Sequence, residues 1–311
     1  MSARPMSSPP TSGSRARRGA MQRVRGFTLI EAIVVIVITG IVASFVAVFV
    51  RVPVKSYVES VARAEATDTA DYAMRRMSRE IRLALPNSVR VKSSGTTVYL
   101  EFLLTKAGLR YLDEDDVGTG GSYLNWNVAA NRVFTVVGGV PTDRRAPIAG
   151  ADYVVVYNLG PDQEPANAYA DCAVGCNRAL IASVDNTAGT ITLASNPFAA
   201  QASSAAGVSL KSPGHRFHLV SSPVTYACDS ATGKLTRHWD YTIASVQPVT
   251  SAALGQSALL ASNLSLCEFT YAGLANVHSG LVGIKLMQKV DDGNGAAPML
   301  LLQQVHVDNT P

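Results

Sequence analysis

The distribution of apolar and polar residues divides this chain into three patterned segments. Residues 32–50 carry no charged side chain, and residues 27–30 extend this apolar segment, which only Glu31 interrupts. At about 1.5 Å per residue, roughly 20 apolar residues in a helix cross the hydrocarbon core of a bilayer. The pattern therefore predicts a transmembrane and assembly helix over residues 27–53.

A helical period continues after the apolar segment. From Tyr57 to Leu85, apolar or small side chains recur at helical spacing, and charged side chains occupy the remaining face. Pro53 is expected to kink this helix or to divide it in two, and Pro86 is expected to stop it. We therefore predict an amphipathic continuation of the helix over residues 54–86, which packs on a sheet.

From Ser88 onward, the apolar residues recur with a period of two in short runs separated by Gly, Pro, Asn and Asp. A long helix followed only by strands predicts an α+β fold, with the helix packed on a mainly antiparallel sheet in an extracytoplasmic globular domain over residues 87–311. Residues 105–150 and 158–214 are expected to be loop-rich insertions. The predicted strands are residues 89–91, 97–104, 132–137, 153–157, 190–193, 215–221, 224–228, 234–241, 264–271, 281–290 and 299–307.

The residues before the apolar segment are basic. Residues 1–26 contain six arginines and no acidic residue, so they account for the net charge of +4 and leave about −2 on the rest of the chain. The positive-inside rule then predicts that this leader is cytoplasmic and that the β-rich domain lies across the membrane. Nucleic-acid binding is not indicated, because the positive charge is confined to this segment. Residues 1–20 are predicted to be disordered, and we expect translation to start at Met21.

The junction between the basic and apolar segments carries a specific motif, RGFTLIE at residues 25–31. A basic leader, a glycine, an aromatic residue and then a glutamate, all at the start of an apolar helix, resemble the processing site of type IV prepilins and type II secretion pseudopilins. One alternative is a plain signal-anchor whose Glu31 reaches the membrane surface. Another is a secretory signal peptide, but the apolar run is long for one and no small-x-small cleavage site follows it.

This resemblance implies a function for each residue of the junction. Gly26 would be the last residue of a leader that a prepilin peptidase removes. Phe27 would become the N-methylated N-terminus, and Glu31 would pair with the terminal amine of a neighbouring subunit during assembly. The implied partners are this peptidase, other minor and major pilins, the inner-membrane assembly platform and the lipid bilayer. The protein would be a single-pass inner-membrane protein with a periplasmic C-terminal domain, and would enter the pilus on assembly.

The resemblance extends past the membrane segment. Residues 69–91, 224–241, 259–271 and 301–311 resemble the minor prepilins of the mannose-sensitive haemagglutinin (MSHA) type IV pilus. This implies a low-copy subunit that initiates or primes pilus assembly. A minor pseudopilin of a type II secretion system shares the same outline and is the alternative. A membrane-anchored envelope enzyme or binding protein is the third interpretation.

The chain has four cysteines, and in an envelope compartment four thiols indicate two disulfides with three connectivities. We favour Cys172–Cys176, which closes a small ring, and Cys228–Cys267, which ends one strand-like run and begins another. A zinc site is the alternative, but the CxxC-like pairs or clustered histidines that it needs are not convincing.

Two acidic stretches are weak candidates for Ca²⁺, because carboxylate oxygens on a turn can bind this ion. They are residues 113–116 and residues 291–295, and neither fits the spacing of an EF-hand loop. Both are expected to be solvated turns. The Ca²⁺ candidates in the second stretch are Asp291, Asp292 and Asn294.

Other metal or catalytic chemistry is not indicated. His215 and His218 would face opposite sides of a strand, so that one metal ion does not easily take both. The sequence has no nucleophile elbow, zinc-protease motif or phosphate-binding loop. We therefore expect a structural protein rather than an enzyme, without a cofactor.

Overall fold

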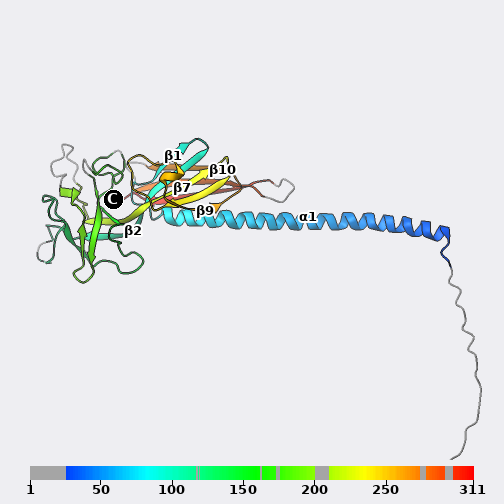
Figure 1. Cartoon of the computed structure of the whole chain (residues 1–311), viewed down its shortest axis with the longest axis horizontal. Helices are drawn as coiled ribbons and strands as arrows, with labels where there is room; N and C mark the ends of the chain where they lie inside the picture. The colour runs from blue at the N-terminus through cyan, green and yellow to red at the C-terminus, as the bar shows by residue number, and fades with distance from the viewer. Residues whose placement is uncertain are drawn as a thin grey trace, which may run out of the picture. The chain divides into compact units, whose positions relative to one another are not determined.

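A computed structural model describes residues 26–116, 118, 120–161, 163–172, 176–199, 210–273, 278–290 and 297–311. The chain divides into two compact units, Met1–Tyr57 and Val58–Pro311. Helix α1 (Leu29–Ile81) begins in the first unit and ends in the second, and β-strands follow it (Figure 1).

Helix α1 continues through Pro53, so it is not divided in two at this residue. It ends at Ile81, before the predicted end at Leu85. The backbone of the following residues pairs with a strand instead, because the Leu85 N–H donates a hydrogen bond to the Leu103 carbonyl oxygen at 2.8 Å. Because these residues pair with a strand, the helix ends before the helical period in the sequence does.

The second unit has the predicted α+β fold, with α1 packed on antiparallel strands. Nine strands form one sheet in the order β1-β2-β3-β6-β5-β4-β7-β8-β9, and three form another in the order β10-β11-β12. The elements are β1 (Arg90–Ser94), β2 (Thr97–Tyr111), β3 (Val133–Val137), β4 (Tyr153–Val155), β5 (Arg178–Asp185), β6 (Thr190–Leu193), β7 (Arg216–Asp229), β8 (Lys234–Trp239), the 3₁₀ helix η2 (Ser251–Ala253), β9 (Gln256–Ala261), β10 (Leu264–Gly273), β11 (Ser279–Gln288) and β12 (Met299–Asp308).

Six strands of the larger sheet close into a ring, in the order β2-β3-β6-β5-β4-β7 and back to β2. The second half of β2 and the first half of β7 close this six-stranded ring. A buried cluster that includes Tyr111, Phe134 and Phe217 belongs to it. Closure removes free strand edges. The prediction that residues 105–150 and 158–214 are loop-rich insertions is therefore wrong for the end of β2 and for β5, which are strands. Strands β3 and β6 also lie within these ranges, and both were predicted as strands.

Strand β7 joins two of the predicted strands into one. The sequence pattern divided them at Pro223, which lacks a backbone N–H for pairing. In the structure Pro223 lies opposite Leu103, next to a register shift in the pairing of β7 with β2, and an irregular position of this kind tolerates the missing donor. The prediction missed β9, whose residues do not alternate between apolar and polar.

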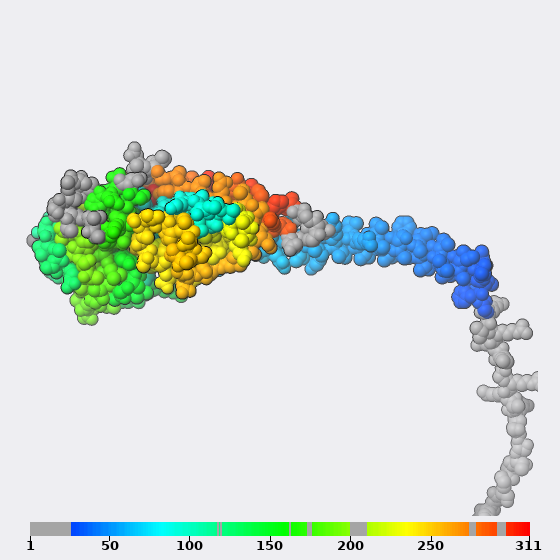
Figure 2. Space-filling model, turned by 45° about the horizontal axis from the view of Figure 1, so that its top comes forward, coloured from blue at the N-terminus to red at the C-terminus, as the bar shows by residue number. Residues whose placement is uncertain are grey.

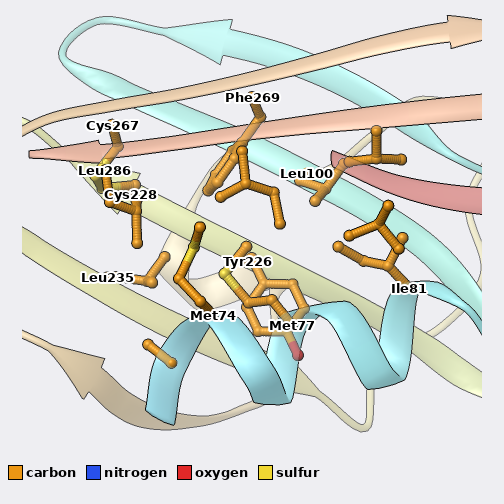
Figure 3. Close-up of a cluster of buried hydrophobic side chains, with 14 of the residues drawn as sticks. Met74, Met77, Ile81, Leu100, Tyr226, Cys228, Leu235, Cys267, Phe269 and Leu286 are labelled. Carbon is orange, nitrogen blue, oxygen red and sulfur yellow. A yellow bond between two sulfur atoms is a disulfide. The ribbon is translucent and has the colours of Figure 1, made fainter. Parts of the chain in front are cut away.

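The main hydrophobic core lies between α1 and both sheets (Figure 3). Met74, Met77 and Ile81 on one face of α1 are buried against side chains of β2, β7, β10 and β11, among them Tyr226 and Phe269. Full burial of an apolar side chain of this size stabilises a fold by about 1.5–3 kcal/mol. The end of α1 is therefore an integral part of the second unit.

Candidate functional site

The residues of the predicted processing site lie immediately before α1. Gly26, Phe27 and Thr28 are not helical, and Phe27 is 78% exposed. A Cβ atom added to Gly26 would meet nothing within 4 Å. The packing of this chain therefore does not require glycine at this position, so a requirement for glycine would come from an enzyme that approaches the backbone.

The first turn of α1 is capped by Thr28. The Glu31 N–H lies 3.1 Å from the Thr28 carbonyl oxygen and 3.3 Å from its hydroxyl oxygen. Thr28 is therefore the N-cap, and Glu31 is the third helical residue, which is the spacing of a capping box. Sequence reasoning missed this local function of Thr28, although the pattern T-x-x-E signals it. The cap fixes where the helix begins, and so leaves the Gly26–Phe27 bond outside it.

The apolar part of α1 has the length and composition of a membrane span, with a mean hydropathy of 3.0 over 18 residues and 0% of that window buried. Figure 2 draws this stretch of α1 in blue, and its apolar side chains are exposed within their own unit. Arg51 and Lys55 follow this apolar run. A helix with apolar side chains on every face is suited to lipid or to the helices of other subunits.

The last turn of α1 is fastened to the larger sheet by a buried charged cluster around Glu80. Its Oε2 accepts hydrogen bonds from the Tyr226 hydroxyl at 2.7 Å and from Nε of Arg237 at 2.8 Å. Its Oε1 lies 3.3 Å from Nε of Arg76 on the same helix. Burial, and the adjacent Glu80 carboxylate, raise the pKa of Tyr226 well above its usual value, so its hydroxyl remains a donor.

Two disulfides are present in the structure. Cys172 is joined to Cys176, and Cys228 on β7 is joined to Cys267 on β10. The second disulfide lies in the main core and links the two sheets (Figure 3). Both cysteine pairs are therefore structural elements of the second unit.

The acidic stretch after β2 differs from the solvated turn that the sequence predicted. Asp113 is only 2% exposed, and its Oδ1 lies 3.2 Å from Nζ of Lys211. The Oδ1 of Asp116 lies 2.7 Å from a guanidinium nitrogen of Arg110, and its Oδ2 lies 3.4 Å from Nδ1 of His215. Burial within this charged group makes the expectation of a solvated turn wrong for Asp113. The other Ca²⁺ candidates, residues 291–295, lie outside the described residues.

The two histidines of the HxxH pattern have different environments. His215 precedes β7 rather than beginning it, while His218 lies within this strand. Burial lowers the pKa of His218 to about 4, so this side chain is neutral at physiological pH. His215 instead lies beside the acidic stretch at residues 113–116. The two segments are far apart in the sequence, so the sequence pattern did not indicate this contact.

Residues 21–47 match the prokaryotic N-terminal methylation motif. This match supports the type IV prepilin and pseudopilin class, and it implies processing by a prepilin peptidase and assembly with other pilins in the membrane. Together with the apolar helix, it indicates a membrane-anchored protein. Comparisons with curated proteins and with solved structures give no match.

Proposed function

We propose that this protein is a minor prepilin of a type IV pilus, similar to MshO of the MSHA pilus. A prepilin peptidase cuts after Gly26, and Phe27 becomes the N-methylated terminus in the inner membrane. The leader is cytoplasmic and the β-rich unit is periplasmic. The mature protein enters the pilus at low copy and initiates or primes its assembly, as a structural subunit rather than as an enzyme.

The observation that carries this proposal is the position of Glu31 within the matched motif. It is the acidic residue in the first turn of an apolar helix, and it follows a glycine and an aromatic residue that both lie outside the helix. A carboxylate in a membrane segment is costly unless it is paired. Cleavage after Gly26 creates an amine near the same membrane depth, and the amine of a neighbouring subunit supplies the missing partner.

The test is Glu31→Ala in a strain that carries no other copy of the gene. Cleavage depends on Gly26 and the basic leader, so the variant is expected to be processed normally. Assembly loses its charge pair, so electron microscopy should show fewer surface pili, each of normal diameter. Glu65→Ala is the matched control, because it removes an exposed carboxylate from the same helix beyond the apolar run. Wild-type pilus numbers with a processed Glu31→Ala protein would contradict the proposed pairing.

Intact mass separates this proposal from an envelope enzyme or binding protein on a plain anchor. Cleavage after Gly26 together with one added methyl group supports the prepilin, and an uncut N-terminus supports the plain anchor. The type II secretion alternative, a minor pseudopilin similar to GspJ, predicts the same mass. A deletion strain distinguishes it, because we expect pili to be lost and protein secretion to continue. Lost secretion with normal pili would assign the protein to the secretion system.

A further inference from the structure

Two segments that lie far apart in the sequence meet at one rim of the six-stranded ring. The end of β2 pairs with the start of β7, and the Tyr111 N–H donates to the His215 carbonyl oxygen at 2.9 Å. This pairing brings the acidic stretch after β2 beside the turn before β7. One carboxylate oxygen each of Asp113 and Asp115 and one ring nitrogen of His215 lie within 4.8 Å of one another.

The Asp113 carboxylate is incompletely satisfied. Its Oδ1 accepts from Nζ of Lys211 at 3.2 Å, but its Oδ2 is buried and has no hydrogen-bond partner within the described part of the chain. The side chain is fully buried, so water does not replace the missing partner freely. An unpartnered buried acceptor destabilises a fold by about 1–3 kcal/mol, and more when it is charged. A bound cation would remove this penalty.

The surroundings of this oxygen indicate a hydrated cation rather than another side chain. The hydroxyl oxygen of Ser212, in the turn before β7, is also buried without a hydrogen-bond partner in the described residues. The Tyr111 ring lies against the His215 ring, with centroids 5.7 Å apart. Asp116 Oδ2 lies 3.4 Å from Nδ1 of His215. A carboxylate beside a histidine is the arrangement that orients a metal-binding imidazole.

We propose that Asp113, Asp115 and His215 bind one divalent transition-metal ion, of the class that includes Zn²⁺ and Mn²⁺. Imidazole nitrogen favours these ions, whereas Ca²⁺ and Mg²⁺ prefer oxygen ligands alone. Two carboxylates neutralise the charge of the ion, and three protein ligands leave positions for water. Metal-bound water supplies a partner for the buried Ser212 hydroxyl. The ion fastens the loop after β2 to the turn before β7, and so stabilises the ring beyond its strand pairing.

The experiment measures metal binding to the full-length protein in detergent micelles after treatment with a chelator. Titration with ZnCl₂ should show one site, and bound Zn²⁺ should raise the unfolding temperature. Asp115→Asn and His215→Gln should each weaken Zn²⁺ binding at least tenfold and abolish the thermal shift. Asp115 is exposed and His215 is partly exposed, so these variants should fold, which circular dichroism checks. Glu114→Gln, at an exposed neighbour outside the ligand set, should bind like the wild type.

Substitution with Co²⁺ gives a second readout, because its visible spectrum reports nitrogen coordination and should change in His215→Gln. Zn²⁺ binding that both ligand variants retain would overturn the proposal, because the ion would then bind elsewhere. Absence of a single saturable Zn²⁺ site would also overturn it. Tighter binding of Ca²⁺ than of Zn²⁺, unaffected by His215→Gln, would overturn the assignment to a transition metal.

Discussion

Glu80 is expected to determine how firmly the end of α1 is held on the larger sheet, and Glu80→Gln tests this. The substitution keeps the shape of the side chain and removes its charge. Arg237 and Glu80 are only 10% and 12% exposed, so the guanidinium of Arg237 loses its carboxylate in a site with little water. The Tyr226 hydroxyl, which donates to the same oxygen, then competes with Arg237 for the single remaining acceptor.

The magnitude follows from the number of charged contacts that are lost. Removing one partner of a buried ion pair costs about 3–5 kcal/mol. Because glutamine retains one acceptor oxygen, we expect a decrease of about 2–4 kcal/mol in the free energy of unfolding. For a domain of this size, that corresponds to a decrease of roughly 5–12 °C in Tm. Asp71→Asn is the matched control, since its ion pair with Arg75 on the same helix is 46% and 79% exposed.

Thermal unfolding of the full-length protein in detergent, followed by near-ultraviolet circular dichroism, measures the effect. An exposed pair contributes about 0–1 kcal/mol, so Asp71→Asn should change Tm little. Arg237→Met combined with Glu80→Gln should destabilise the fold by less than the sum of the single changes. Equal, small effects of Glu80→Gln and Asp71→Asn would refute the reasoning, as would strict additivity in the double variant.

Three further predictions concern processing, cross-linking and pH. Gly26→Leu should block cleavage and leave the precursor in the membrane, and mature product of normal size on an immunoblot would disprove the cut site. Cys228→Ala and Cys267→Ala should each lower the free energy of unfolding by about 4 kcal/mol, and the double variant should be no worse; free thiols at both positions in oxidised protein would contradict the pairing. Burial lowers the pKa of His218 to about 4 in the folded protein, whereas its pKa in the unfolded chain is about 6.5. The unfolded chain therefore binds a proton first as pH falls, and the free energy of unfolding decreases between about pH 6.5 and pH 4. Between pH 7 and pH 4.5 this loss should be about 2–3 kcal/mol in urea unfolding, and His218→Gln should flatten the dependence; an unchanged pH profile would exclude His218 as its cause.

Local patterns in the sequence predicted the helix and the strands whose formation depends on the spacing of their own apolar side chains. The apolar helix and most strands follow from side-chain periodicity, and the α+β fold follows from their order. Helix α1 ended earlier than its periodicity indicated because the backbone at Leu85 pairs with Leu103, a tertiary contact that periodicity does not contain. The division of β7 at Pro223 failed for a similar reason, since a register shift accommodates the proline.

The six-stranded ring and the contacts at its rim could not be predicted from local patterns. Ring closure depends on which strands pair, and β2 and β7 are distant in the sequence. The proximity of Asp113 to His215 follows from that pairing register alone. The fastening of Glu80 to Arg237 likewise joins a helix to a strand far along the chain. Sequence reasoning placed Glu80 on a charged helix face and residues 113–116 in a solvated turn, because their partners are not near them in sequence.

The cap at Thr28 also affects how reversible subunit association would be. It places Glu31 in the first turn of α1, where the aligned peptide dipoles amount to about half a positive charge. A carboxylate at this position is therefore partly compensated by its own helix before any neighbour arrives. The amine of an incoming subunit adds to this compensation instead of neutralising a bare charge, so the net gain on pairing is moderate. A moderate gain favours ordered addition to the filament and still permits a wrongly placed subunit to leave.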